Sequence, residues 1–386
     1  MPWQEQTRMS LRQEFVSLAA QEGANVRQLC RRFGISPTTG YIWLARYAAA
    51  GDAGLAERSR RPTRSPAHTP ADVEQTVLAL RQAQPTWGGR KLRQRLLDLG
   101  CTAVPSASTI TAILRRHGHL APTSAAAHTP WQRFEHAQPN AVWQMDFKGH
   151  VALSSGRCHP LTVLDDHSRF LLGLVACGNE QEATVMAQLT ALLRRYGLPQ
   201  AILTDNGPPW GVPQAPERLT TLGAWLIRLG IEPWHGRVRH PQTQGKVERL
   251  HRTLKAERLQ PSQRYADLAT CQAALDTWRD TYNLERPHAA LDLAVPASRY
   301  QPSPRAFPEA LPPIEYGPDD IVRQVHTDGQ IKYRNQRFAV SHALVRQPVA
   351  LRPTTVDGIL DVVYCHVIVT HLDLRQPATP PGHAVD

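Results

Sequence analysis

The chain has 386 residues, of which 41% are hydrophobic, so it is too long for one ordinary domain and too apolar for wholesale disorder. Its net charge of +11 and pI of about 9.7 favour a polyanionic partner. The six cysteines form no C-x-x-C pair, which excludes zinc-ribbon and redox spacing. No secretory signal or membrane-spanning apolar run is visible, so we expect a soluble, intracellular protein.

The N-terminal segment has the pattern of a helix-turn-helix. We expect helices over 7–22 and 26–33 and a third helix that starts at Pro37, with Asn25 and Ser36 as N-caps. The start of the third helix would face a DNA major groove. The predicted DNA contacts here are Thr38, Thr39, Tyr41 and Arg46. The alternative is an ordinary three-helix packing unit, and the basic charge of the segment favours DNA binding.

A basic, Pro-containing linker follows, and then a second helical pattern. Arg60, Arg61 and Arg64 in the linker could track phosphates, or the linker could be only a spacer. Helices are expected over 71–84, from Arg90 to Leu99, and from 109 to 117. This segment is predicted to be a second, winged-helix-like DNA-binding domain, with Arg90, Lys91 and Arg93 as DNA contacts.

From about residue 137 the pattern becomes three strands and then alternating helices and strands, in the order βββαβαβα. This order is that of a ribonuclease-H-like core. After a Pro-rich stretch, alternating apolar residues predict a small all-β barrel. The fold class expected is therefore multidomain α/β. The predicted segments are 1–57 (helix-turn-helix), 58–69 (basic linker), 70–120 (second helical domain), 121–136 (linker), 137–300 (ribonuclease-H-like catalytic core) and 319–376 (β-barrel).

Three carboxylates occupy separate elements of the predicted core. Asp146 lies within an apolar strand, Asp205 ends a short buried strand, and Glu248 lies on an amphipathic helix. A buried carboxylate is costly unless a metal or hydrogen bonds compensate it. Three carboxylates from separate elements suit a two-metal phosphoryl-transfer site, although each one alone is a weak signal.

Several motifs closely resemble bacterial insertion-sequence transposases with a DDE, retroviral-integrase-like catalytic core. These motifs are Gln144–Gly149, Leu164–Phe170, Thr204–Gly207, the specific run His240–Lys255, and Tyr282–Leu291. The resemblance implies that Asp146, Asp205 and Glu248 form a DDE triad that binds two Mg²⁺ ions, with Mn²⁺ able to replace them. It also implies cleavage of double-stranded DNA at element ends, strand transfer into target DNA, and a homo-oligomer on DNA in the bacterial cytoplasm, at the nucleoid.

One spacing departs from the family. The stretch between Asp205 and Glu248 is somewhat longer than usual, and the excess falls in the Pro-rich loop 208–216. Loops tolerate insertions cheaply, so we expect the site to remain competent.

Other polar residues of the core are open to two interpretations. DNA-backbone contacts are predicted at His240, Lys246, Arg249, Arg252 and Lys255. The alternative for His240 is a structural role in its loop, and the alternative for the other four is a solvated helix face. For Asp165 and Asp166 a hydrogen-bonded turn is favoured over metal binding. Two other functions are possible: an inactive helix-turn-helix regulator derived from a transposase, or a metal-dependent nuclease without strand transfer.

Overall fold

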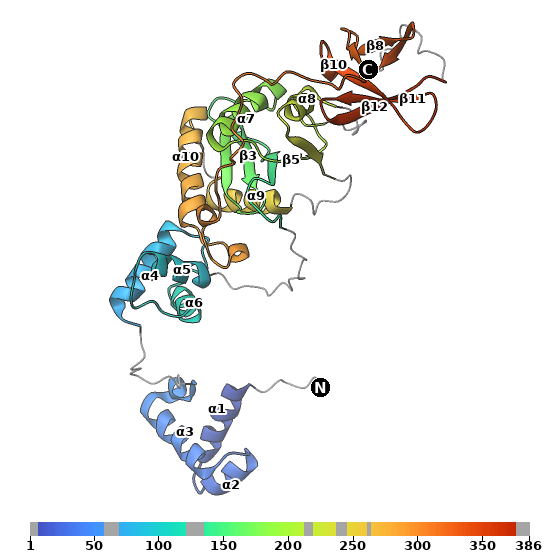
Figure 1. Cartoon of the computed structure of the whole chain (residues 1–386). Coiled ribbons are helices and arrows are strands. Elements are labelled where there is room, and N and C mark those ends of the chain that lie inside the picture. The colour runs from blue at the N-terminus through green and yellow to red at the C-terminus, as the bar shows by residue number, and fades with distance from the viewer. Residues whose placement is uncertain are drawn as a thin grey trace. The chain divides into compact units, whose positions relative to one another are not determined.

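The computed structural model describes residues 7–57, 69–120, 135–211, 219–236, 245–260 and 264–375. The chain divides into two compact units, Met1–His68 and Thr69–Asp386, and each is described here by itself (Figure 1). Arg60, Arg61, Arg64 and His240, all predicted to contact DNA, lie outside the described residues. Within the described ranges, no helix combines the length and the apolarity that crossing a membrane requires.

The first unit is a bundle of three helices, α1 (Arg8–Ala19), α2 (Val26–Arg32) and α3 (Pro37–Ala50). The expected caps are present, because Asn25 Oδ1 accepts from the Gln28 amide and Ser36 Oγ from the Thr39 amide. Phe15, Val16, Cys30 and Leu55 form the buried core. This arrangement is the helix-turn-helix that the sequence predicts.

The second unit begins with three more helices, α4 (Ala71–Ala83), α5 (Gly89–Asp98) and α6 (Ala107–Arg116). Ser106 caps α6, with its Oγ accepting from the Thr109 amide. Apolar residues at helical spacing on α5 and α6 close around Trp87, which is 1% exposed. The module therefore has a core of its own.

The middle of the second unit is built on a six-stranded sheet. Its strands are β1 (Val142–Phe147), β2 (Val151–Ala152), β3 (Arg157–Asp165), β4 (Leu171–Cys177), β5 (Ala201–Thr204) and β6 (Glu232–His235). The strand β3 pairs antiparallel with β1 and β4, whereas β5 pairs parallel with β1 and β6. The order β4-β3-β1-β5-β6 is that of the expected ribonuclease-H-like core, and only the two-residue β2 was not anticipated.

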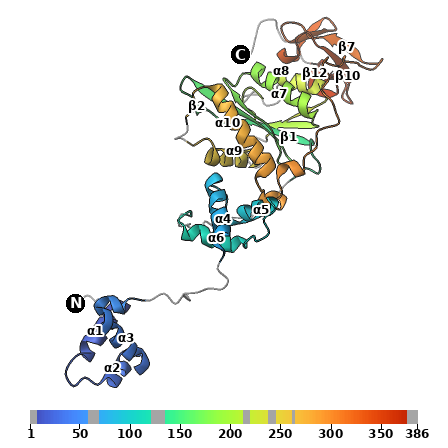
Figure 2. The same ribbon diagram turned by 90° about the vertical axis from the view of Figure 1, so that its left-hand side faces the viewer.

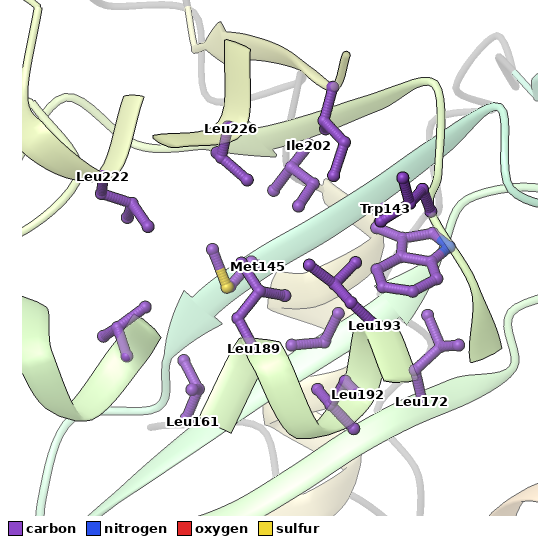
Figure 3. Packing of buried hydrophobic residues seen from close by; sticks show 14 of the residues in the cluster. Trp143, Met145, Leu161, Leu172, Leu189, Leu192, Leu193, Ile202, Leu222 and Leu226 are labelled. Carbon is purple, nitrogen blue, oxygen red and sulfur yellow. The ribbon is translucent and has the colours of Figure 1, made fainter. Parts of the chain in front are cut away.

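Helices cover both faces of this sheet. Trp143 and Met145 of β1 pack with residues of α7 (Glu182–Tyr196) and α8 (Thr221–Arg228), as Figure 3 shows. The other face packs against α9 (Gly245–Glu257) and α10 (Leu268–Asp280), and α10 runs across the front of the strands in Figure 2. Since side chains alternate along a strand, Gln144 and Asp146 face the side of the sheet that α9 covers.

The C-terminal region is β-rich, but the expected barrel is not confirmed. The strands β7 (Ile321–Gln324), β10 (Pro348–Pro353), β11 (Ile359–Tyr364) and β12 (Val367–Asp373) form an open antiparallel sheet in the order β12-β11-β10-β7. A separate hairpin consists of β8 (Gln330–Tyr333) and β9 (Gln336–Ala339). Alternating apolar residues identify half-buried strands, but they do not determine whether the edge strands pair to close a barrel.

Candidate active site

Asp146 lies on β1, and Asp205 directly follows its parallel neighbour β5, at the same end of the two strands. Gln144 on β1 pairs in register with Leu203 on β5, and each aspartate follows two residues later. Residues two apart on a strand point to the same face, so both carboxylates are directed to the face that α9 covers. The carboxyl ends of parallel strands are where open α/β sheets place their ligands.

The helix α9 crosses this face and carries Glu248. Its core stripe is Val247, Leu250 and Leu254, all buried against the sheet, while Glu248 is exposed. His251, one turn after Glu248, has its Nδ1 3.8 Å from Oδ2 of Asp146. Among the described residues, no three His, Cys, Asp or Glu side chains converge as a ready-made metal-binding group. The structure thus brings Asp146 and Asp205 close together and places Glu248 on the helix that packs on this face. Glu248 does not join the two aspartates in a three-carboxylate cluster among the described residues.

The electrostatics of this edge are unfavourable for two carboxylates alone. Burial raises the pKa of Asp146 to about 7, and the nearby Asp205 carboxylate acts in the same direction. Loss of hydration also raises the pKa of Asp205, against the opposing effects of the Gly207 amide and His235. Burial lowers the pKa of His251 to about 3, so this imidazole is neutral and does not neutralise Asp146. An added cation would relieve the strain between the two aspartates.

Sequence reasoning missed the groups that surround Asp146. Thr162 Oγ1 donates to the Asp146 carbonyl oxygen at 2.8 Å and lies 2.9 Å from Nε2 of His251. Gln144 donates through Nε2 to Asp166 Oδ1 at 2.7 Å. The spacing of His251 one helical turn after Glu248 is the signal that could have identified it, because residues three apart share a helix face.

Asp165 and Asp166 occupy the turn after β3 and are almost fully buried. Asp165 accepts hydrogen bonds from the Ser168 amide and hydroxyl and from the Asn140 amide, at 2.5–2.8 Å. Asp166 forms an ion pair with Lys246. These bonds agree with the hydrogen-bonded turn that the sequence favours.

The predicted DNA contacts of the first unit lie around the start of α3. Thr38 is exposed, and Tyr41 is 53% exposed. Thr39 is half-buried, with its hydroxyl 2.8 Å from Ser36 Oγ. The Arg46 guanidinium lies over the Trp43 ring, 4.9 Å from its centroid. An exposed tyrosine and threonine at the start of the helix are available to an external partner, while Thr39 and Arg46 also serve the packing of the unit.

On α5 the three predicted DNA contacts differ in their surroundings. Arg90 is exposed, whereas Lys91 and Arg93 are half-buried. Burial lowers the pKa of Lys91 to about 8, with Arg286 acting in the same direction. On the next turn, Arg95 donates to Glu285 Oε2 at 2.6 Å. This part of α5 therefore faces other residues of the second unit rather than solvent.

The basic residues of α9 fall into two groups. Arg249, Arg252 and Lys255 are exposed, and none of their side chains forms an ion pair with a described residue. Lys246 is different, because its Nζ lies 2.5 Å from Asp166 Oδ2. Three of the four described α9 positions predicted to contact DNA are thus free to do so.

Comparison with protein-family models assigns most of the chain. Two integrase core domain models match residues 136–241 and 229–296. The N-terminal part matches a helix-turn-helix domain over residues 11–63 and a homeodomain-like domain over 39–114. The C-terminal domain of IS481 family transposases matches residues 320–379. These matches follow the order of the elements described above.

Individual relatives include proteins of bacterial insertion elements. The chain is 27% identical over 159 residues to the "Insertion element IS407 uncharacterized 31.7 kDa protein" of Burkholderia multivorans, a match that covers 41% of this chain and 54% of that protein. It is 27% identical over 161 residues to the "Insertion element IS476 uncharacterized 39.2 kDa protein" of Xanthomonas euvesicatoria, covering 42% of this chain and 44% of that protein. The chain thus spans about half the length of these curated relatives.

Among solved structures, the HTLV-2 integrase catalytic core domain in complex with magnesium is 17% identical, with a TM-score of 0.31. That match covers 43% of this chain and 99% of the other chain. The integrase core, the IS481-type C-terminal domain and the insertion-element relatives agree with one another. The chain therefore contains an integrase core domain, followed by a region that matches the C-terminal domain of IS481 family transposases, and it is similar to proteins of bacterial insertion elements.

Proposed function

We propose that the protein binds the ends of an insertion sequence and catalyses metal-dependent DNA cleavage and strand transfer through Asp146, Asp205 and Glu248. The observation that carries this proposal is the proximity of Asp146, near the end of β1, to Asp205, which directly follows the parallel neighbour β5, on the sheet against which the helix bearing Glu248 packs. Carboxylates from separate elements at one edge are what a site for two divalent cations requires.

The residues present fit Mg²⁺ better than a softer metal. The three proposed ligands are all carboxylates, which hard cations prefer, and no cysteine belongs to the set. Asp146 and Asp205 repel each other when both are ionised, which a divalent cation would offset. When bound, Mg²⁺ or Mn²⁺ would activate the attacking oxygen and stabilise the leaving oxygen of an in-line displacement at phosphorus.

The chain's own residues would supply positioning and charge for DNA. The strand β1 and the residue after β5 place two carboxylates at one edge of the sheet, and on α9 Glu248 shares a helix face with the exposed Arg252 and Lys255, next to the exposed Arg249. These cations suit the phosphate backbone of DNA near the reacting phosphate. The helix-turn-helix of the first unit supplies the sequence-specific recognition that distinguishes a transposase from a degradative nuclease. Because two element ends must react together, we expect a homo-oligomer on DNA.

A strand-transfer assay tests the proposal. The full-length protein would be mixed with a labelled duplex bearing candidate element ends, a plasmid target, and Mg²⁺ or EDTA. Glu248→Gln is expected to abolish joined product while leaving end binding intact. Asp276→Asn is the matched control, since it removes a partly exposed carboxylate of α10 that pairs with Arg279 and is not one of the three proposed ligands.

The outcomes separate the candidate functions. Joined product that needs both the metal and Glu248 would support the transposase. Cleavage without joining would favour a nuclease, and end binding without cleavage would favour an inactive regulator. Cleavage retained in Glu248→Gln would remove this residue from the proposed triad.

A further inference from the structure

Asp166, which follows β3 directly, connects the two elements that carry Asp146 and Glu248. Its Oδ1 accepts a hydrogen bond from Gln144 Nε2 at 2.7 Å, and its Oδ2 lies 2.5 Å from Lys246 Nζ. Gln144 precedes Asp146 by two residues on β1, and Lys246 precedes Glu248 by two residues on α9. One carboxylate therefore connects the strand of the first proposed ligand to the first turn of the helix that carries the third.

The two charged groups of this connection are largely buried, and both form further hydrogen bonds. The Asp166 side chain is 3% exposed and that of Lys246 is 17% exposed. Oδ2 of Asp166 also accepts from the His136 amide at 3.1 Å, and Lys246 donates to the Asp166 carbonyl oxygen at 3.2 Å. A buried charge that loses its partner is strongly unfavourable, so this pair fixes the position of the α9 N-terminus. An exposed ion pair would not have this effect.

Lys246 differs from the other cations of its helix because its charge is paired with a buried carboxylate. Arg249, Arg252 and Lys255 are exposed and are available to phosphates, whereas the Lys246 ammonium donates twice to Asp166. To contact DNA, Lys246 would have to leave a buried carboxylate without its counter-charge. This cost opposes the phosphate-contact role expected from the sequence.

We propose that Lys246 is a positioning residue, whose ion pair with Asp166 sets the separation of Glu248 from Asp146 in the metal site, and that it does not contact DNA. The inference rests on the proposed function, because it assumes that both carboxylates hold the metal. It predicts that Lys246 acts on metal affinity, while the exposed Lys255 of the same helix acts on DNA affinity.

The test measures two quantities on the full-length protein. Binding of Mn²⁺ without DNA is followed by the electron paramagnetic resonance signal of free Mn²⁺, and binding of element-end duplex is measured in EDTA. Lys246→Met is expected to weaken Mn²⁺ binding about tenfold, as loss of a supporting group around a metal ligand does. Its DNA affinity should stay at the wild-type value. Lys246→Arg should restore most of the Mn²⁺ affinity, because it keeps the ion pair.

Lys255→Met is the matched control, with the opposite expectation of weakened DNA binding and unchanged Mn²⁺ binding. If Lys246→Met fails to fold, the double variant Lys246→Met with Asp166→Asn removes both charges and leaves no buried charge unpaired. It too should bind Mn²⁺ less tightly. Mn²⁺ affinity at the wild-type value in whichever variant folds would overturn the proposal. So would a loss of DNA binding as large as that of Lys255→Met.

Asp146→Asn separates this inference from the proposed function. If Asp146→Asn binds Mn²⁺ as tightly as the wild type, the metal site itself is misplaced and the proposed function fails. If Asp146→Asn weakens Mn²⁺ binding and Lys246→Met does not, the metal site stands and only the positioning role of Lys246 is wrong.

Discussion

Nδ1 of His251 on α9 lies 3.8 Å from Oδ2 of Asp146 on β1. Thr162 explains the orientation of the ring, because its hydroxyl has one proton and donates it to the Asp146 carbonyl oxygen. Thr162 Oγ1 must then accept from Nε2 of His251, 2.9 Å away. In the neutral ring this leaves Nδ1 unprotonated, so His251 is linked to Asp146 through Thr162 and the Asp146 carbonyl oxygen, and this bridge connects β1 to α9.

His251→Leu should lower the single-turnover rate of end cleavage by about tenfold, the lower end of the range for a group that supports a metal ligand. His251→Gln should retain most of the rate, because its amide can still donate to Thr162. The rates would be measured at saturating Mg²⁺ with a labelled end duplex. A leucine variant as fast as the wild type would show that the imidazole has no part in positioning Asp146.

Asp165→Ala should destabilise the protein without acting on the metal. The substitution leaves the Asn140 amide and the Ser168 amide and hydroxyl without their acceptor in a buried site. Buried unsatisfied groups cost about 1–3 kcal/mol each, so a loss of roughly 3 kcal/mol or more is expected. Guanidinium unfolding would measure it. Weakened Mn²⁺ binding at unchanged stability would instead make Asp165 a ligand.

Gly40→Val should disrupt the first unit and its DNA binding. A Cβ atom at Gly40 would lie 2.4 Å from Cys30 Sγ and 3.0 Å from Phe15 Cζ. Overpacking of this kind costs about 1–3 kcal/mol. Hydrogen exchange of α1–α3 should accelerate and end binding should weaken. Ala48→Val, at an exposed position of the same helix, is the control and should leave both nearly unchanged.

Glu74 should make the helical module of the second unit sensitive to acid. Hydrogen bonds from Arg116, above all, and from His117 hold the pKa of Glu74 below its ordinary value of 4.5. Since folding favours the ionised form, this stabilisation is fully present above about pH 4.5 and is lost as the pH falls through the lowered pKa. Hydrogen exchange of α4 and α6 in wild type and Glu74→Gln would measure the difference at each pH.

At neutral pH the amides of α4 and α6 should exchange more slowly in the wild type than in Glu74→Gln. This difference in protection should become smaller as the pH falls below 4.5, the ordinary pKa of a glutamate. A gap that is constant over the whole range would mean that the charge of Glu74 is irrelevant to the packing of α4 on α6.

Local signals in the sequence were sufficient for most of the fold. Capping residues such as Asn25, Ser36 and Ser106 mark helix starts because their side chains satisfy free amides of the first turn. The strands β7 and β12 were not anticipated. The first is only four residues long and its sequence, Ile-Val-Arg-Gln, does not alternate apolar and polar residues, while the second exposes Ile368 to 51%.

The candidate site could be predicted only in part, for a physical reason. The proposed triad was recognisable because Asp146, Asp205 and Glu248 lie in distinctive local motifs. The bonds of Asp166 to Gln144 and Lys246 join residues far apart in the chain, and no local pattern reveals such partners. For the same reason the sequence shows only the helix and the charge of Lys246, which predict a DNA contact, and does not show its ion pair with Asp166.

The positions of the elements along the chain also determine the order in which its parts can fold during synthesis. The helices α1–α3 and the core residue Leu55 all lie within residues 8–55, so the first unit can fold as soon as it leaves the ribosome. The catalytic edge needs β1, β5 and α9, which begins only at Gly245. If the proposed function holds, a nascent chain acquires a folded helix-turn-helix unit before its catalytic edge is complete, and a truncated product that stops ahead of α9 would bind DNA ends without cleaving them.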